Sequence, residues 1–239
     1  MKSDAANSIF AGLDNNARFV GGAVRDAMLG KDATDIDIAT SLPPDEVTKR
    51  LQGRGIKIVP TGIKHGTVTA VTSGGNFEIT TLRHDIKTFG RHAEVAFTDN
   101  WQEDAARRDF TINAMSCSQD GEIFDYFGGV TDLEAGKIRF VGDAETRCRE
   151  DFLRILRFFR FFAYYGKPPA DNEALTACKL LASGIDNLSG ERIQAEMFKL
   201  LAVPNPIESL QLMVNNGVML HVIPEIPENA FSHLEKLLE

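Results

Sequence analysis

Ala17-Arg-Phe-Val-Gly-Gly-Ala-Val-Arg-Asp26, followed closely by Asp35-Ile-Asp-Ile-Ala-Thr40, sets the architecture of the N-terminal half of the chain. Residues 17–20 indicate a strand that runs into a double glycine. Residues 22–29 then indicate a helix closed by Gly30. Residues 35–40 alternate polar and apolar side chains, which is the period of a strand. This stretch therefore predicts a strand, a helix and a second strand in direct succession.

Asp35 and Asp37 are the first candidates for chemistry, because carboxylates at i and i+2 of a strand share one face and lie about 7 Å apart. Two carboxylates this close repel each other, and ionising both becomes favourable when a hard divalent cation lies between them. Glu78 is a candidate third carboxylate, because Phe77 and Ile79 are expected to face the core and Glu78 the opposite side. The alternative for an isolated Asp-x-Asp is a turn or a solvated edge strand.

Gly21 and Gly22 precede the predicted helix that carries Arg25 on its first turn. Glycines allow a ligand to approach the backbone closely, and a helix start with a guanidinium favours phosphate oxygens. The chain contains neither a GxGxxG fingerprint nor a GxxxxGK[ST] loop. The alternative is an ordinary strand–helix turn that requires a positive φ. Together with the aspartate pair, these residues predict a metal-dependent nucleotide site.

The remaining elements divide the chain into a part with strands and a part without them. We expect further helices at 5–16, 44–54 and 99–107, and strands near 56–59, 66–72, 76–82 and 122–125. Residues 83–98 combine Arg, His and Asp with little periodicity, which predicts a long mobile loop.

After Gly142 the strand signals stop, and we expect helices at 143–165, 171–182, 190–202 and 206–216. The predicted fold class is α+β. Residues 1–141 are expected to form a head with a mixed β-sheet flanked by helices. Residues 142–239 are expected to form an all-α neck and a partial body.

The composition is that of a globular protein: the chain has 239 residues, 43% of them hydrophobic, and a formal net charge of −8. No apolar run approaches the roughly 18–20 residues of a membrane span, and Met1-Lys2-Ser3-Asp4 does not begin a signal peptide, so no membrane association is expected. Cys117, Cys148 and Cys178 form no CxxC pair, which argues against disulfides and structural zinc and favours a cytoplasmic location. The acidic charge disfavours sequence-blind nucleic-acid binding, although arginines between residues 147 and 160 offer a local basic surface.

Arg108 and Asp109, in Arg107-Arg-Asp-Phe-Thr-Ile-Asn113, form a second candidate set. An arginine beside an aspartate offers donors for a phosphate and an acceptor for a ribose hydroxyl. The alternative is a local ion pair at a helix end.

Asp151, Arg154 and Arg157 follow one another in steps of three, which places them within one face of about 120° on the predicted helix 143–165. A carboxylate and a guanidinium one turn apart can present an acceptor and donors to the edge of a nucleobase. The alternative is an intrahelical ion pair of Arg154 with Glu150 or Asp151.

Read in order, these segments resemble the class II tRNA nucleotidyltransferase and bacterial poly(A) polymerase family of the polymerase-β superfamily. The segments that carry the resemblance lie within roughly residues 17–202 and are Phe19-Val-Gly-Gly-Ala-Val-Arg-Asp26, Asp35-Ile-Asp37, Lys64-His-Gly-Thr67, Glu78-Ile-Thr-Thr-Leu-Arg83, Arg107-Arg-Asp-Phe-Thr-Ile-Asn-Ala114, Asp125-Tyr-Phe-Gly-Gly129, Glu150-Asp-Phe-Leu-Arg-Ile-Leu-Arg157 and Ser189-Gly-Glu-Arg192. Each motif is weak alone, and the ordered combination is specific.

The resemblance implies a role for each candidate. Asp35 and Asp37 would bind Mg²⁺, with Mn²⁺ as the alternative ion. Asp151 and Arg154 would read the Watson–Crick edge of CTP or ATP. Residues 83–98 align with the family's flexible loop, which is implicated in the switch from C to A addition, and Gly128-Gly129 aligns with its hinge. The other nucleotide-binding candidates would be Gly21, Gly22 and Arg25 at the triphosphate, Arg108, Asp109 and Asn113 at phosphate and ribose, and Arg157 and Arg160 in support.

The activity implied by the resemblance is template-independent, metal-dependent addition of CMP and AMP from CTP and ATP to the 3′ end of tRNA. The motifs indicate no RNA-contacting residues and no protein partner. A poly(A) polymerase, an adder of only C or only A, and a non-catalytic RNA- or nucleotide-binding module remain alternatives. Family members usually continue with further body and tail helices beyond the position of Glu239, so a naturally short enzyme and a fragment both stay open.

Overall fold

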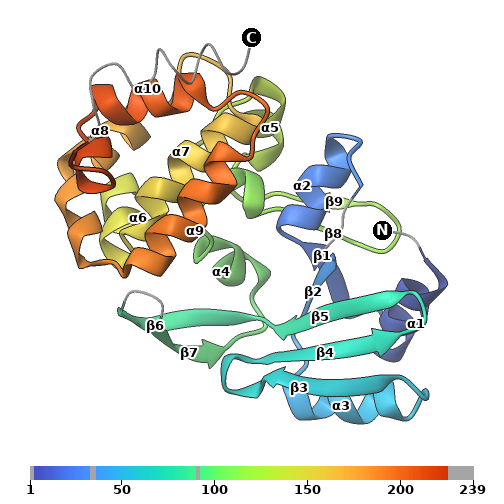
Figure 1. Cartoon of the computed structure of the whole chain (residues 1–239). Coiled ribbons are helices and arrows are strands. Elements are labelled where there is room, and N and C mark those ends of the chain that lie inside the picture. The colour runs from blue at the N-terminus through green and yellow to red at the C-terminus, as the bar shows by residue number, and fades with distance from the viewer. Residues whose placement is uncertain (1–2, 33–35, 90–91, 226–239) are drawn as a thin grey trace. The chain divides into compact units, whose positions relative to one another are not determined.

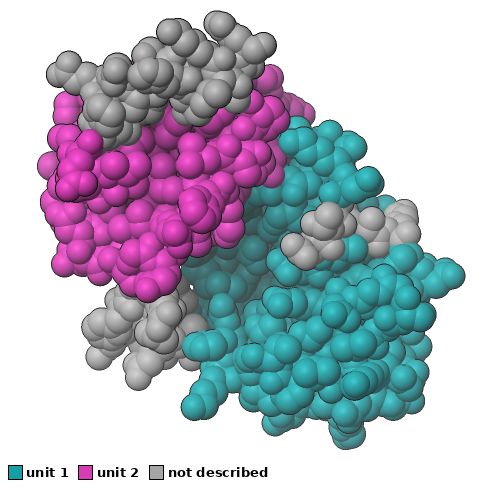
Figure 2. Space-filling view, in the orientation of Figure 1, with its two compact units in different colours: residues 1–87, 93–130 teal, residues 88–92, 131–239 magenta. Residues whose placement is uncertain are grey.

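The computed structural model describes residues 3–32, 36–89 and 92–225, and it divides into two compact units (Figures 1 and 2). Unit 1 comprises residues 1–87 and 93–130, and unit 2 comprises residues 88–92 and 131–239. The predicted functional boundary at residue 141 stays a prediction.

A seven-stranded mixed sheet forms the centre of unit 1, with strand order β3-β4-β5-β2-β1-β8-β9 (Figure 1). Strands β2 and β5 pair in parallel, and the other neighbouring pairs are antiparallel. The strands are β1 (Ala17–Val20), β2 (Ile36–Thr40), β3 (Lys57–Gly62), β4 (Thr67–Thr72), β5 (Gly75–Thr81), β8 (Ser116–Cys117) and β9 (Ile123–Phe124). The mixed sheet confirms the predicted fold class of the head.

Four helices lie wholly within the described residues of unit 1: α1 (Asp4–Gly12), α2 (Gly22–Met28), α3 (Pro44–Gln52) and α4 (Trp101–Ala106). Single 3₁₀ turns lie at η1 (Ile63–His65) and η2 (Thr111–Asn113). Phe10 of α1 packs on Phe19 of β1 with ring centroids 4.7 Å apart, and both side chains are buried. Leu51 of α3 is fully buried as well. Burial of these large apolar side chains is the main contribution to the stability of the unit.

Residues 83–97 differ from the sequence prediction. Strands β6 (Arg83–Phe89) and β7 (His92–Phe97) form a separate two-stranded sheet, so the predicted irregular loop is wrong for these residues. The charged residues of the segment hid a strand period: Ala93, Val95 and Phe97 alternate with polar or small residues. Two-stranded pairing satisfies the backbone groups that a loop would leave to water.

Helices make up the described part of unit 2 beyond residue 131, which confirms the predicted all-α second part. Helix α5 (Gly129–Ala135) spans the division between the units. The others are α6 (Ala144–Glu150), α7 (Leu153–Tyr165), α8 (Asn172–Leu180), α9 (Gly190–Leu201), α10 (Ile207–Asn215) and the 3₁₀ segments η3 (Ala182–Asn187) and η4 (Met219–His221). Phe158 and Phe159 of α7 are fully buried, and Phe158 stacks on Phe140. These phenylalanines therefore belong to the core of unit 2.

A break at Asp151 divides the predicted helix 143–165 into α6 and α7. Asp151 has an extended backbone, with φ −155° and ψ 107°. Its Oδ1 accepts a hydrogen bond from the N–H of Leu153, which is the first residue of α7. Asp151 therefore does not share a helical face with Arg154 and Arg157, and that sequence inference is wrong. The cause is the ability of a short carboxylate to replace the backbone acceptor at a helix start.

Across the described ranges, no helix is both long and apolar enough to cross a membrane.

Candidate functional site

Asp37 and Glu78 are direct neighbours on the parallel strands β2 and β5. Neighbouring residues of a pleated sheet project from the same face, and adjacent strands lie about 4.8 Å apart. Phe77 and Ile79 are buried while Glu78 is exposed, which confirms that Glu78 faces away from the core. The pairing of two strands that are far apart in sequence thus brings two carboxylates together on the open face of the sheet.

Asp35 lies outside the described residues, so its predicted place beside Asp37 stays a prediction. Within residues 3–32, 36–89 and 92–225, no group of three His, Cys, Asp or Glu side chains is arranged to hold a metal ion. The two described carboxylates nevertheless fit a hard divalent cation, because carboxylate oxygens are the donors that Mg²⁺ and Ca²⁺ prefer. With Asp35, three such donors would be available.

Gly21 forms the turn between β1 and α2 and has φ 68° and ψ −131°, a conformation that favours glycine. A Cβ atom at this position would lie 2.8 Å from Nη1 of Arg108. A Cβ at Gly22 would lie 3.4 Å from Nη2 of Arg25. The double glycine therefore lets two guanidinium groups approach the backbone at the start of α2, where the sequence predicts a triphosphate.

Arg25 is only 7% exposed, whereas an arginine predicted to bind phosphate is expected to be accessible. Its Nε and Nη2 donate to the carboxylate of Asp26, each over 2.9 Å. Its Nη1 donates to Oδ1 of Asn113 over 2.5 Å. Arg25 is therefore held rigidly by its neighbours, and its predicted contact with a triphosphate stays a prediction.

Asn113 joins the glycine turn to the Arg108-Asp109 motif. Its Nδ2 donates to Oδ1 of Asp109 over 3.0 Å while its Oδ1 accepts from Arg25. Oδ1 of Asp109 also accepts from the N–H of Phe110 over 2.9 Å. The side chain of Asn113 is 8% exposed, so both ends of the amide are satisfied inside the protein. This arrangement places Arg25, Asp109 and Asn113 in one hydrogen-bonded network.

Asp104 of α4 anchors the two arginines of the motif, a role that our sequence analysis did not assign. Its carboxylate pairs with Arg107 at 2.9 Å and with Arg108 at 3.3 Å, and it accepts from the N–H of Arg83. Burial alone would raise the pKa of Asp104, but the charges of Arg107 and Arg108 bring that pKa below its usual value. Asp104 lies three residues before Arg107 and four before Arg108, and this helical spacing is the sequence signal that predicts both ion pairs.

In unit 2, Asp151 pairs with a residue far away in the sequence. Nη2 of Arg192, on α9, donates to Oδ2 of Asp151 over 2.7 Å. Both side chains remain partly accessible, at 23% for Arg192 and 18% for Asp151. One oxygen of Asp151 therefore caps α7 and the other pairs with Arg192, which leaves a defined orientation for the carboxylate.

The arginines of α7 each have identified neighbours. Arg154 pairs with Glu150 and donates to the carbonyl oxygen of Arg147 over 3.0 Å. The ion pair considered from the sequence is therefore present, but it joins α6 to α7 instead of lying within one helix. Nε of Arg160 donates to the buried Glu196 over 2.6 Å.

Phe161 provides an aromatic face for both of the later arginines of α7. The guanidinium of Arg160 lies 4.4 Å from its ring centroid, and that of Arg157 lies 5.5 Å from it. Sequence reasoning missed Glu196, because partners on different helices leave no periodic signal.

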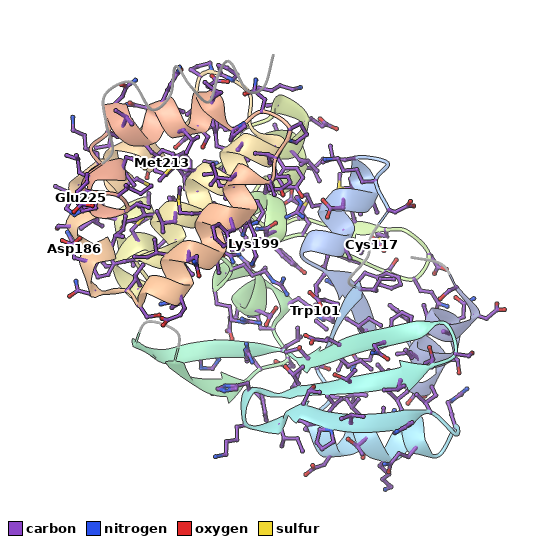
Figure 3. The ribbon with its side chains drawn as sticks, viewed as in Figure 1. Trp101, Cys117, Asp186, Lys199, Met213 and Glu225 are labelled. Atoms are coloured by element: carbon purple, nitrogen blue, oxygen red, sulfur yellow. The ribbon has the colours of Figure 1, made fainter. Side chains whose placement is uncertain are left out.

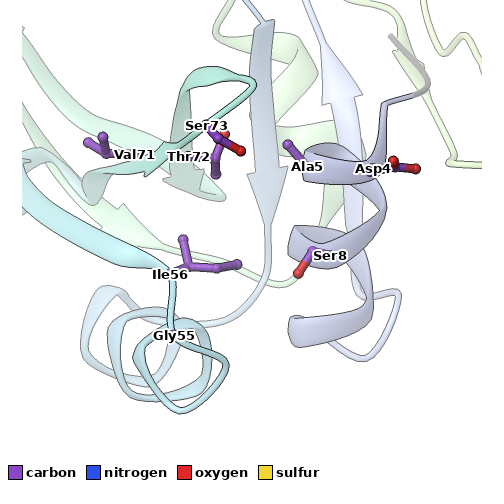
Figure 4. A pocket seen from close by; sticks show the side chains of 8 residues that line it. All are labelled: Asp4, Ala5, Ser8, Gly55, Ile56, Val71, Thr72 and Ser73. Carbon is purple, nitrogen blue, oxygen red and sulfur yellow. The ribbon is translucent and has the colours of Figure 1, made fainter.

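A cavity of about 390 Å³ lies elsewhere in unit 1, between α1, the residues after α3 and the β4–β5 turn (Figure 4). Its lining residues are Asp4, Ala5, Ser8, Gly55, Ile56, Val71, Thr72 and Ser73. None of the candidate site residues lines it, so the cavity is separate from the candidate site.

Two family models match parts of the chain. The model of the poly(A) polymerase head domain matches residues 17–139, and a model described as the probable RNA- and SrmB-binding site of polymerase A matches residues 171–229. The chain is 45% identical over 225 residues to CCA tRNA nucleotidyltransferase 1, mitochondrial, of Mus musculus, covering 93% of this chain and 51% of that protein.

Solved structures agree with the sequence relatives. The Bacillus stearothermophilus CCA-adding enzyme in complex with CTP superimposes with a TM-score of 0.80 at 33% identity, covering 100% of this chain and 57% of that one. The Thermotoga maritima CCA-adding enzyme complexed with tRNA superimposes with a TM-score of 0.80 at 26% identity, covering 99% and 57%. The chain thus spans about half the length of the mouse relative.

Proposed function

The chain belongs to the family of the poly(A) polymerase head domain, and on this premise we propose that it is a nucleotidyltransferase that adds CMP and AMP from CTP and ATP to the 3′ end of tRNA. The observation that carries the proposal is the pairing of Asp37 with Glu78 on one open sheet face, in the same unit as the network of Arg25, Arg108 and Asn113. A carboxylate pair and a guanidinium-rich turn are the groups that metal-dependent nucleotidyl transfer requires.

Unit 1 supplies the reactive groups in this proposal. Asp35 and Asp37 would hold Mg²⁺, with Glu78 as the third carboxylate of the centre, because carboxylate oxygens are hard ligands. A bound divalent ion would activate the 3′-hydroxyl of the acceptor and neutralise charge on the triphosphate. The choice of Mg²⁺ over Mn²⁺ is tested by measuring activity with each ion after dialysis against a chelator.

The glycine turn and its arginines bind the nucleotide triphosphate in this proposal. Gly21 and Gly22 would admit the phosphates close to the backbone, and Arg108 would donate to their oxygens. Asp109 would accept from a ribose hydroxyl, as Asn113 holds one of its oxygens in place. Arg25 would act from behind this turn, because its guanidinium is engaged by Asp26 and Asn113.

Unit 2 selects the base in this proposal. Asp151 and Arg154 would offer an acceptor and donors to the Watson–Crick edge of CTP or ATP. Their orientation is supported by Arg192, which holds Asp151, and by Glu150, which holds Arg154. Arg157 and Arg160 would support the nucleotide from the face that they share with Phe161.

A tRNA lacking its terminal CCA, incubated with the protein and with CTP and ATP separately and together, tests the proposal. We expect C addition with CTP alone and complete CCA with both nucleotides, as read by sequencing the products. Long A tails without use of CTP would contradict the proposal and favour a poly(A) polymerase. Addition of only one nucleotide type would identify a specialised adder, and no incorporation would favour a binding module.

A cytoplasmic location is part of the proposal. Cys117, Cys148 and Cys178 are all buried free thiols, which agrees with a reducing compartment. The mouse relative carries "mitochondrial" in its name, so cell fractionation followed by immunoblotting is the direct test. Recovery in the mitochondrial fraction would contradict the proposed location.

A further inference from the structure

Arg18 of β1 lies at the centre of an aromatic cluster that none of the proposed roles uses. Its guanidinium lies 4.1 Å from the ring centroid of Trp101 and 3.5 Å from that of Phe124. Its Nη1 donates to the hydroxyl oxygen of Tyr126 over 3.2 Å. Three residues from two other segments of unit 1 thus converge on the Arg18 guanidinium, and we call these four residues the Arg18 cluster.

The cluster lies on the same face of the sheet as the candidate carboxylates. Arg18 is directly opposite Ala39 in the register of β1 and β2, and Asp37 precedes Ala39 by two residues. Such diagonal neighbours on one face lie about 7–8 Å apart. Trp101 packs against Val20, Ala39 and Leu82 at the start of α4, beside the sheet (Figure 3). The cluster therefore borders the place where nucleotidyl transfer is proposed.

The charge of Arg18 has no carboxylate partner within residues 3–32, 36–89 and 92–225. Its contacts there are the two rings and one phenol, although the side chain is half-buried. Arg25, Arg108 and Arg160 each pair with a carboxylate. A half-buried cation without a counter-ion is costly, and an anionic ligand removes that cost. A guanidinium in contact with aromatic rings keeps N–H donors that can still bind a phosphate.

Tyr126 adds an exposed aromatic surface next to this cation. It is 38% exposed, and its loop is fixed by Asp125, whose carboxylate accepts from the N–H groups of Phe127, Gly129 and Val130. Aromatic rings beside arginine are the usual elements of single-stranded RNA binding, because bases stack on rings and phosphates pair with guanidinium groups. A rigid loop loses little conformational entropy when a base stacks on it.

We propose that the Arg18 cluster binds the single-stranded 3′ end of the RNA acceptor, with Arg18 on a backbone phosphate and Tyr126 stacked on a base. The proposal rests on the proposed function, which supplies an RNA acceptor and places its reacting hydroxyl near Asp37. It assigns the RNA contact that the sequence motifs leave without residues.

Equilibrium binding of fluorescein-labelled tRNA lacking CCA tests the proposal without any turnover. Arg18→Gln should weaken binding about five-fold and reduce the slope of log Kd against log salt by about 0.7, the value for one phosphate contact with a single strand. Tyr126→Ala should weaken binding about five- to ten-fold with little change of slope, because stacking is not ionic. Tyr126→Phe should bind like the wild type, since it keeps the ring.

Two control variants distinguish an RNA contact of Arg18 from a purely structural role of this side chain. Arg18→Lys keeps the charge and should keep the salt slope. Arg54→Gln removes the same charge from an exposed position after α3 and should change neither Kd nor slope. Melting temperatures of all variants are measured in parallel.

An Arg18→Gln protein with wild-type RNA affinity and slope would overturn the proposal, whatever its melting temperature. Undetectable RNA binding by the wild type would also overturn it. Failure of the proposed function is seen separately, as wild-type protein that binds RNA but incorporates no CTP.

Discussion

Arg192 on α9 donates a hydrogen bond to Asp151 over 2.7 Å, across 41 residues of sequence. The pair joins α9 to the break between α6 and α7, and it fixes one oxygen of the carboxylate proposed to read the base. Since the other oxygen caps α7, Asp151 is held at both ends. A carboxylate oriented in this way presents a defined acceptor pattern, which is what discrimination between CTP and ATP requires.

Replacing Arg192 by Gln should therefore reduce the selectivity between CTP and ATP. A hydrogen bond to a charged group contributes about 1.5–3 kcal/mol, so we expect the ratio of kcat/KM for CTP and ATP to change about ten-fold. The measurement is single-nucleotide incorporation into tRNA ending before each position. Lys199→Gln is the matched control, because Lys199 is an exposed cation of the same helix (Figure 3). Equal selectivity in both variants would remove Arg192 from base selection.

Asp37→Asn should abolish nucleotide transfer but leave CTP binding largely intact. Losing a metal-binding carboxylate removes several kcal/mol of transition-state stabilisation, so kcat should fall on the order of a thousand-fold. Glu78→Gln should reduce kcat less, because Glu78 is proposed as the third carboxylate and not as a primary ligand. Rapid-quench measurement of CMP incorporation gives kcat, and equilibrium dialysis gives CTP affinity. An Asp37→Asn enzyme with wild-type kcat would refute the carboxylate assignment.

Gly21→Ala should damage both stability and triphosphate binding. The φ of 68° is strained for alanine, at about 1–3 kcal/mol, and the new Cβ would lie 2.8 Å from Nη1 of Arg108. Gly30→Ala is the matched control: Gly30 has φ 69°, but no atom lies within 4 Å of the added Cβ. Both variants should lose stability in urea, while only Gly21→Ala should raise KM for CTP. A normal KM in Gly21→Ala would separate the glycine turn from nucleotide binding.

Asp104→Asn should destabilise unit 1 in a pH-dependent way. The pKa of Asp104 is below its usual value of 3.8 in the folded protein, since Arg107 and Arg108 outweigh the effect of burial. A lowered folded-state pKa stabilises the fold above the unfolded pKa, and this stability is lost as the pH falls through the lower folded value. At pH 7 the variant should therefore be about 3 kcal/mol less stable, as for breaking a buried ion pair.

The difference between wild type and Asp104→Asn should stay constant from pH 7 to about pH 5 and shrink below pH 3.8. Urea unfolding at a series of pH values measures it. Asp99→Asn, at an exposed carboxylate just before α4, is the control and should show little change at any pH. A difference that grew as the pH fell would contradict the ion-pair account of Asp104.

The strands and helices of the first half of the chain were predictable because their signals are local. Residues 17–20 form the predicted strand, and the predicted helix at 22–29 is observed at Gly22–Met28. The two errors also have local causes. Charged residues hid the period of the strands at 83–97, and a side-chain cap interrupted a continuous helical pattern at Asp151.

The candidate residues were visible in the sequence as residue types, but most of their partners were not. Asp37 faces Glu78 because β2 pairs with β5, and no local period specifies which strands pair. The same holds for Asn113, whose amide links Arg25 to Asp109. Arg25 and Asn113 are 88 residues apart in the sequence. The sequence did not mark Arg18 as a functional candidate, because a single arginine in a strand is common and its aromatic neighbours come from other segments.

Helix and strand signals, the double glycine and the acidic and basic motifs follow from short-range rules, since backbone sterics and side-chain periodicity act over a few residues. Other features depend on segments that come into contact only when the core forms. These are the strand order, the pairing of Asp37 with Glu78, the Arg192–Asp151 hydrogen bond and the aromatic rings around Arg18. Burial of apolar surface determines which segments pack together, and this burial depends on the whole chain rather than on any one motif.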